Sequence, residues 1–140
     1  MNFAFESTLG ATTIPKLLRG AAVSHDVHIL LVGLDSPERH IARVAARVQA
    51  GGHDIPEAKI RTRYTSSRAN LIDLMPVLAS LQVYDNSEEV IADGKTIPLP
   101  TRLLAMEDGA ITYEAPPGSV PDWAKALVQA AREHVKSRAR

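Results

Sequence analysis

The chain has 140 residues, enough for one domain with a buried core, and its 45% hydrophobic and 23% charged residues are ordinary for a globular protein. Sixteen basic residues balance sixteen acidic ones, so no overall field favours nucleic acid or an anionic membrane as a partner. The absence of cysteine excludes disulfides, thiolate metal sites and a cysteine nucleophile. No apolar run is long enough to cross a bilayer, and no signal-peptide pattern opens the chain, so a cytoplasmic location is expected.

The first residues predict a strand, a helix and a second strand. Residues 2–5 alternate as a short strand that ends at Glu6, and Thr12 or Thr13 caps the helix that follows. Residues 27–34 form a continuous apolar run, which predicts a strand covered on both faces in the middle of a parallel sheet.

Two further helices are expected after this run. Ser36 caps the first, with Pro37 at its first position, and Gly51-Gly52 end it. Its expected buried stripe is Ile41, Val44, Ala45 and Val48. The second helix begins near Pro56-Glu57 and is kinked or divided at Pro76. Its apolar positions at helical spacing are Ile60, Tyr64, Leu71, Leu74 and Leu78.

The remainder of the chain predicts strands, tight turns and one more helix. Residues 81–84 form a short strand, and Asp93-Gly94 and Asp108-Gly109 are typical of hairpin turns. Pro121 opens a final helix with Trp123, Leu127, Ala131 and Val135 on one face. We therefore expect an α/β sandwich with a parallel sheet over residues 1–92. Residues 93–140 add a β-hairpin appendage and a C-terminal helix, packed with that core as one domain.

Glu6, Ser7 and Thr8 are the first candidate site. A carboxylate at the carboxyl end of a parallel strand lies where open α/β sheets bind ligands, and it can orient a substrate hydroxyl or act as a base. The alternative is a solvated strand end without a function.

Arg61, Arg63 and Arg68 are the second candidate site. Arg61 and Arg68 are seven residues apart and share a helical face, which suits bidentate binding of phosphates. The alternative is a solvated helix face. No spacing of histidine and acidic residues predicts a metal site, and His53-Asp54 is interpreted as part of a helix stop. The sequence contains no G-x-x-x-x-G-K-[ST] loop, and Gly94-Lys95-Thr96 lies in an expected hairpin, so it is not such a loop.

An ordered set of motifs resembles the zeta-toxin-like family of P-loop kinases. The set is E-S-T-L after an aromatic strand, an apolar strand followed by D-S-P-E, R-V-x-x-G-G-H-x-I-P, I-R-T-R-Y, and V-Y-D-N-S. It runs from about Asn2 to about Ala92, roughly two-thirds of the chain. Members of this family are similar to toxins that phosphorylate a UDP-activated amino sugar with ATP, and ATP and Mg²⁺ are the cofactors that the resemblance implies.

The resemblance implies roles for the matched positions. Glu6 lies on the substrate side, with Ser7 and Thr8, and acts in catalysis with Arg61 and Arg68. Nucleotide binding is assigned to Arg61, Arg63, Arg68, Asp85 and Asn86. In the family a first strand, a P-loop and an acidic substrate base precede the region that matches Asn2, and this chain contains none of them. The phosphate- and metal-binding elements are therefore missing.

The missing strand would lie between residues 2–5 and residues 27–34. Its loss leaves two open strand edges, unless these strands pair directly, and predicts a homodimer or a complementing chain as partner. The sequence leaves open whether the chain is an enzyme. It is either a kinase fragment that is inactive as an isolated chain, or a non-catalytic descendant that binds a nucleotide or a protein and acts as an interaction or oligomerisation module. An unrelated small α/β domain ranks last.

Overall fold

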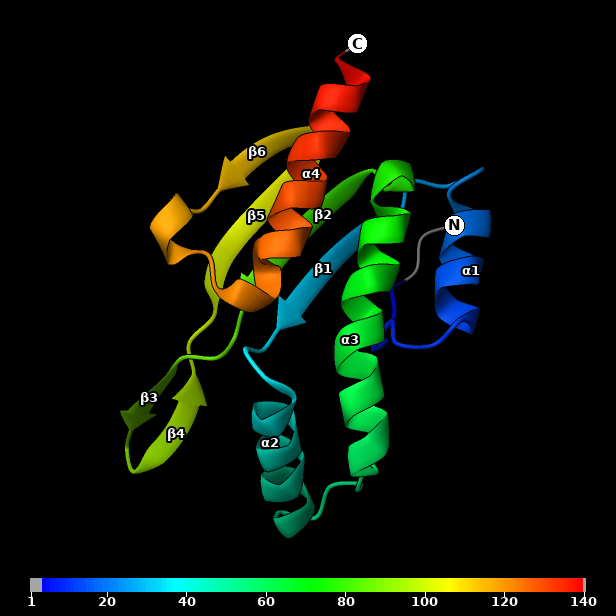
Figure 1. Ribbon diagram of the computed structural model, residues 1–140. Coiled ribbons are helices and arrows are strands. Elements are labelled where there is room, and N and C mark those ends of the chain that lie inside the picture. Colours follow the sequence, from blue (N-terminus) through cyan, green and yellow to red (C-terminus); the bar gives the residue numbers. More distant parts are fainter. Residues whose placement is uncertain (1–3, 140) are drawn as a thin grey trace.

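A computed structural model describes residues 4–139, in which a mixed four-stranded sheet carries helices and a separate β-hairpin stands beside it (Figure 1). The elements in chain order are α1 (Thr13–Ala21), β1 (His28–Gly33), α2 (Pro37–Gln49), α3 (Glu57–Leu74), η1 (Met75–Val77), β2 (Ser80–Asp85), β3 (Glu89–Ala92), β4 (Lys95–Pro98), β5 (Thr101–Glu107), β6 (Ala110–Glu114), η2 (Pro117–Ser119), η3 (Asp122–Ala124) and α4 (Lys125–Arg138).

The ends of the long helices follow local sequence signals. The Ser36 hydroxyl caps α2 by accepting the Arg39 N–H at 3.2 Å, with Pro37 in the first turn. Gly51 has a φ of +96°, which lets the chain leave α2 in the left-handed region. The α3 helix ends at Leu74, and Pro76 lies in the 3-10 turn that follows, as the sequence predicts.

Both predicted hairpin turns are confirmed. Asp93 and Gly94 have φ angles of +51° and +73°, and Asp108 and Gly109 have +50° and +78°. Two consecutive positive φ angles are the geometry of a type I′ turn, whose twist matches that of paired strands. The first turn joins β3 to β4 and the second joins β5 to β6.

The α/β class is confirmed, whereas the sheet is mixed. Its strand order is β1-β2-β5-β6, and β1 pairs in parallel with β2, with Ile29 opposite Leu81. The pairs β2–β5 and β5–β6 are antiparallel. The connections agree with these directions: a two-residue turn joins β5 to β6, which it can do only for antiparallel neighbours, while the helices α2 and α3 connect β1 to β2. The β3–β4 hairpin lies between β2 and β5 in the chain. The expected parallel arrangement is thus limited to one strand pair.

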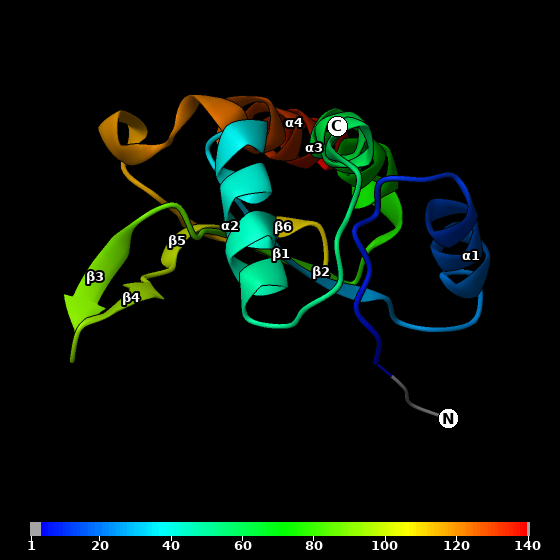
Figure 2. The same ribbon diagram turned by 90° about the horizontal axis from the view of Figure 1, so that it is seen from below.

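The core lies between the sheet and the helices α3 and α4. These helices cover one face of the sheet, as the view along the strands makes plain (Figure 2). The largest fully buried side chains of this layer are Leu71, Leu74, Leu81, Val83, Leu103, Leu104 and Leu127. The β3–β4 hairpin stands apart from the main sheet (Figure 1), and all eight residues of its two strands are exposed.

The prediction that residues 27–34 form the most buried, central strand is wrong. β1 is the edge strand of the sheet, and its residues alternate between exposed and half-buried. Leu30 and Val32 point away from the helices and are 64% and 49% exposed. Among the described residues no second layer covers that face, so the apolar run that predicts two covered faces has only one.

The structure also differs from two other expectations for the first half of the chain. Residues 2 and 3 of the predicted first strand lie outside the described residues, and Ala4 and Phe5 belong to no strand. The α2 stripe is buried only at Val44, whereas Ala45 and Val48 are exposed. No residue of α1 is buried. Apolar surface that the sequence assigns to a core is therefore exposed on β1 and α2.

Candidate functional site

The first candidate segment, residues 6–11, is an irregular stretch before α1. Glu6, Ser7 and Thr8 are exposed, and they do not follow a strand within the described residues. Leu9 is buried and has a φ of +57°, an uncommon value for a residue with a side chain. The Ser7 hydroxyl accepts the Leu9 N–H at 3.1 Å and stabilises this turn. The carboxylate of Glu6 is thus open to solvent beside an ordered turn.

Side chains of α3 hold the second half of this segment. The Asn70 Nδ2 donates to the carbonyl oxygens of Leu9 at 2.6 Å and Ala11 at 3.0 Å. The Ser66 hydroxyl donates to the carbonyl oxygen of Gly10 at 2.6 Å. Three consecutive carbonyl groups therefore have partners on one face of α3.

Gly10 brings the segment against Arg63. A Cβ atom built on Gly10 would come within 2.5 Å of the Arg63 Cγ and 3.0 Å of its Cα, so only glycine allows this approach. The structure therefore places one of the three predicted phosphate-binding arginines beside the segment that carries Glu6. Arg63, Ser66 and Asn70 share a helical face because they are three and four residues apart.

Arg61 is bound by acidic side chains. Its guanidinium donates to Glu38 of α2 at 2.8 Å and to Glu57 of its own helix at 3.0 Å. The hydrogen bond from Arg61 holds the pKa of Glu38 below its usual range. Because both carboxylates are solvent-exposed, these ion pairs compete weakly with a phosphate, and Arg61 acts here as a bridge between α2 and α3.

Arg68 lies two residues from both Ser66 and Asn70, so it is on the side of α3 away from segment 6–11, and it packs against Tyr64. Its guanidinium carbon lies 4.4 Å from the centre of the Tyr64 ring, a cation–π geometry. Its Nη1 donates to the backbone carbonyl of Trp123 at 3.2 Å. Burial raises the pKa of the Tyr64 phenol. Arg61 and Arg68 thus have separate partners in this structure.

The third group of predicted residues lies at the carboxyl end of β2. One carboxylate oxygen of Asp85 accepts the Ser87 hydroxyl at 2.5 Å and the Trp123 Nε1 at 3.3 Å. The Ser87 hydroxyl in turn accepts the Asp35 N–H at 2.8 Å, which joins the ends of β1 and β2. Asn86 has a buried Oδ1 without a hydrogen-bond partner in the described part of the chain. Since Arg68 contacts Trp123, the Arg68, Asp85 and Asn86 positions lie at one end of the sheet.

The structure bears on two further expectations from the sequence, the absence of a metal site and the interpretation of Gly94-Lys95-Thr96. Within residues 4–139 no three histidine or acidic side chains are placed to hold a metal ion. Gly94 is the turn of the β3–β4 hairpin and Lys95 begins β4, so this Gly-Lys-Thr is no phosphate loop. Over the same residues no helix is long and apolar enough to span a bilayer.

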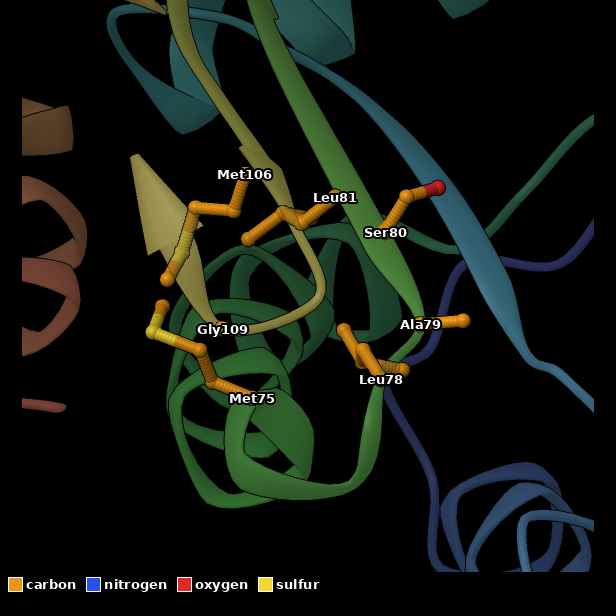
Figure 3. Close-up of a pocket in the computed structure, with 7 residues that line it drawn as sticks. All are labelled: Met75, Leu78, Ala79, Ser80, Leu81, Met106 and Gly109. Carbon is orange, nitrogen blue, oxygen red and sulfur yellow. The ribbon is translucent and has the colours of Figure 1, made fainter. Parts of the chain in front are cut away.

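Two hollows of the structure lie away from the predicted site residues. One, of about 10 Å³, lies among apolar side chains at the start of β2, where Met75, Leu81 and Met106 meet (Figure 3). It has room for no more than one water molecule. A more open one of about 230 Å³ lies near Asp26, Asp108 and Arg138. Neither is lined by a residue that the sequence predicts to be functional.

Comparison with known proteins adds one relative. No family model and no solved structure match the chain. An uncharacterized protein of Haemophilus influenzae is 35% identical to it over 65 residues. The matched stretch covers 46% of this chain and 46% of the relative, so it spans less than half the length of either. This similarity carries no activity over to the chain.

Sequence reasoning missed the residues that hold the site together. Asn70 and Ser66 lie in the interior of α3, where Asn and Ser are less favourable than Ala or Leu. Their presence there is the one sequence signal that could have pointed to a role outside the helix. The sequence predicts Trp123 only as part of the apolar face of the last helix, whereas its buried indole also donates its N–H to Asp85. Ser87 appears in the sequence only as the last residue of V-Y-D-N-S, with no signal for its bonds to Asp85 and Asp35.

Proposed function

We propose that the chain is the acceptor-side half of a zeta-toxin-like kinase. In this proposal it binds a nucleotide sugar through segment 6–11 and α3, and the phosphate donor is held by a P-loop that the chain does not contain. The isolated chain is then a binding domain without phosphotransferase activity. The ordered motifs support the family, and the geometry supports the acceptor role.

The observation that carries the proposal is the attachment of segment 6–11 to α3. Asn70 and Ser66 bind three carbonyl groups of the segment, and Gly10 packs on Arg63. The segment that carries Glu6 is therefore attached to the helix that carries Arg63. A carboxylate can accept hydrogen bonds from sugar hydroxyls, and a guanidinium can pair with phosphate. These two groups suit the two parts of a sugar that is linked to a diphosphate.

Titration with UDP-N-acetylglucosamine tests the proposal. We expect calorimetry to detect binding and the amide resonances of residues 6–11 to shift. Glu6→Gln should weaken binding about tenfold, because a hydrogen bond to a charged group contributes about 1.5–3 kcal/mol. Glu133→Gln, which changes an exposed carboxylate on α4, is the control and should bind as wild type does. Absence of binding by the wild-type chain would contradict the acceptor role.

A second function, a non-catalytic interaction module, is favoured by one observation. The outer edge of β1 pairs with no strand among residues 4–139, and Leu30 and Val32 beside it are exposed. Open strand edges pair readily with other chains. If the chain associates through β1 and binds no nucleotide sugar, this second function replaces the first.

A further inference from the structure

We infer that Asn70 is a positioning residue that fixes segment 6–11 to α3 so that Glu6 and Arg63 keep one relative placement. What the segment binds rests on the proposed function. The attachment itself rests on the hydrogen bonds of this structure and can be tested without any ligand.

The chemistry of the Asn70 amide suits this role. A carboxamide has two N–H donors on one nitrogen, and the two acceptors lie at 2.6 Å, on Leu9, and 3.0 Å, on Ala11. One side chain therefore spans the turn and binds the carbonyl groups on both sides of Gly10. No residue with a single donor can do this.

Ser66 contributes less to the attachment. Its hydroxyl has one proton and lies within hydrogen-bond distance of two carbonyl oxygens, that of Gly10 at 2.6 Å and that of Thr62 at 3.0 Å. If the bond to Gly10 is lost, the proton retains a partner in its own helix. Ser66 therefore supports the segment, whereas Asn70 determines its position.

Burial of side chains contributes little to holding the segment. Residues 6–8 are exposed, and Leu9 adopts a positive φ that its side chain disfavours. The buried Leu9 side chain anchors one point of the turn. The hydrogen bonds from Asn70 to Leu9 and Ala11 then set the direction of the chain on both sides of the turn, toward Glu6 before it and toward α1 after it. A rotation of the segment would therefore change where Glu6 lies relative to α3.

The Asn70→Asp substitution tests this inference. Aspartate has the shape of asparagine, but its carboxylate places oxygens against the carbonyl oxygens of Leu9 and Ala11 and donates nothing. We expect backbone order parameters of residues 9–11 to fall from about 0.85 to below about 0.6, while those of α3 remain unchanged. Ser66→Ala should lower them less. Binding of UDP-N-acetylglucosamine should weaken about tenfold in Asn70→Asp, as expected for two lost hydrogen bonds.

Two further variants keep the test decisive. Asn70→Ala removes both donors without adding a charge, and it replaces Asn70→Asp if that variant does not fold. Val128→Ala destabilises the buried side of α4 and should change neither the order parameters of residues 9–11 nor the dissociation constant. Unchanged order parameters in both Asn70 variants would overturn the inference. If the wild-type chain binds no nucleotide sugar, the proposed function fails, while the order parameters still decide the role of Asn70.

Discussion

Trp123 packs directly on Gly33, where β1 ends. A Cβ atom built on Gly33 would come within 2.3 Å of the Trp123 Cη2 and 2.6 Å of its Cζ3. The same tryptophan donates its indole N–H to Asp85 and accepts from Arg68 through its backbone carbonyl. Trp123, in the η3 turn that precedes α4, therefore joins the carboxyl ends of β1 and β2 to α3.

Gly33→Ala should destabilise the chain. The added methyl has no space beneath the indole ring, and overpacking a close contact costs about 1–3 kcal/mol. We expect the midpoint of urea unfolding to fall and the fluorescence of Trp123, the only tryptophan, to change in the native state. Gly20→Ala in α1 is the matched control: it meets no atom within 4 Å and should be neutral or stabilising by up to about 1 kcal/mol. Equal stability of wild type and Gly33→Ala would contradict this packing argument.

Local signals predicted the elements well, because they act over a few residues. Ser36 and Gly51 mark the ends of α2, and Asp93-Gly94 and Asp108-Gly109 form the turns where the sequence expects them. The position of β1 in the sheet could not be obtained in this way. The apolar run indicates a strand that is compatible with burial on both faces, whereas its edge position depends on which other strands are present.

The exposed side of β1 should mediate association. Leu30 and Val32 are 64% and 49% exposed, next to a strand edge whose outer backbone groups have no strand partner among residues 4–139. Light scattering should therefore show a mass that rises with concentration, and Leu30→Lys should shift the chain toward the monomer by placing a charge at the edge.

Val23→Lys is the control for this experiment. Val23 is 89% exposed but lies in the turn after α1 and not on a strand. The Val23→Lys substitution should therefore leave the association unchanged. A monomer at all concentrations for wild type and Leu30→Lys alike would refute the role of the β1 edge.

The candidate site was predictable only in its residue types. The arginines of α3 were found, but one helix sends them to different partners: Arg61 to Glu38, Arg63 to Gly10, and Arg68 to Tyr64 and Trp123. Helical spacing gives the direction of a side chain from the helix axis. The groups that it meets come from distant parts of the chain, and no local pattern contains them.

Stability should depend on the protonation of His40. Burial, followed by the charges of Arg43 and Arg47, lowers the pKa of this imidazole, which lies edge-on to Tyr64. A histidine whose pKa is lower in the folded state binds more protons when unfolded, so its contribution to stability is present above about pH 6.5 and is lost as the pH falls through the folded-state value. Urea unfolding at pH 7.5, 6.5 and 5.5 should show a decreasing free energy of unfolding. His40→Gln should make this decrease smaller, and an identical pH profile would disprove the assignment.

The isolated chain should bind a nucleotide sugar but transfer no phosphate to it. Catalysis of phosphoryl transfer comes almost entirely from positioning and charge stabilisation by a phosphate cradle and a metal ion. The sequence has no such glycine-rich loop, and the described residues hold no group of metal ligands. Incubation with Mg²⁺-ATP and UDP-amino sugars, followed by mass spectrometry, should therefore yield no phosphorylated sugar. Turnover that survives stringent purification and disappears in Glu6→Gln would mean that the chain supplies a donor site of its own. Contaminating kinases are distinguished by the same variant, because their activity would not depend on Glu6.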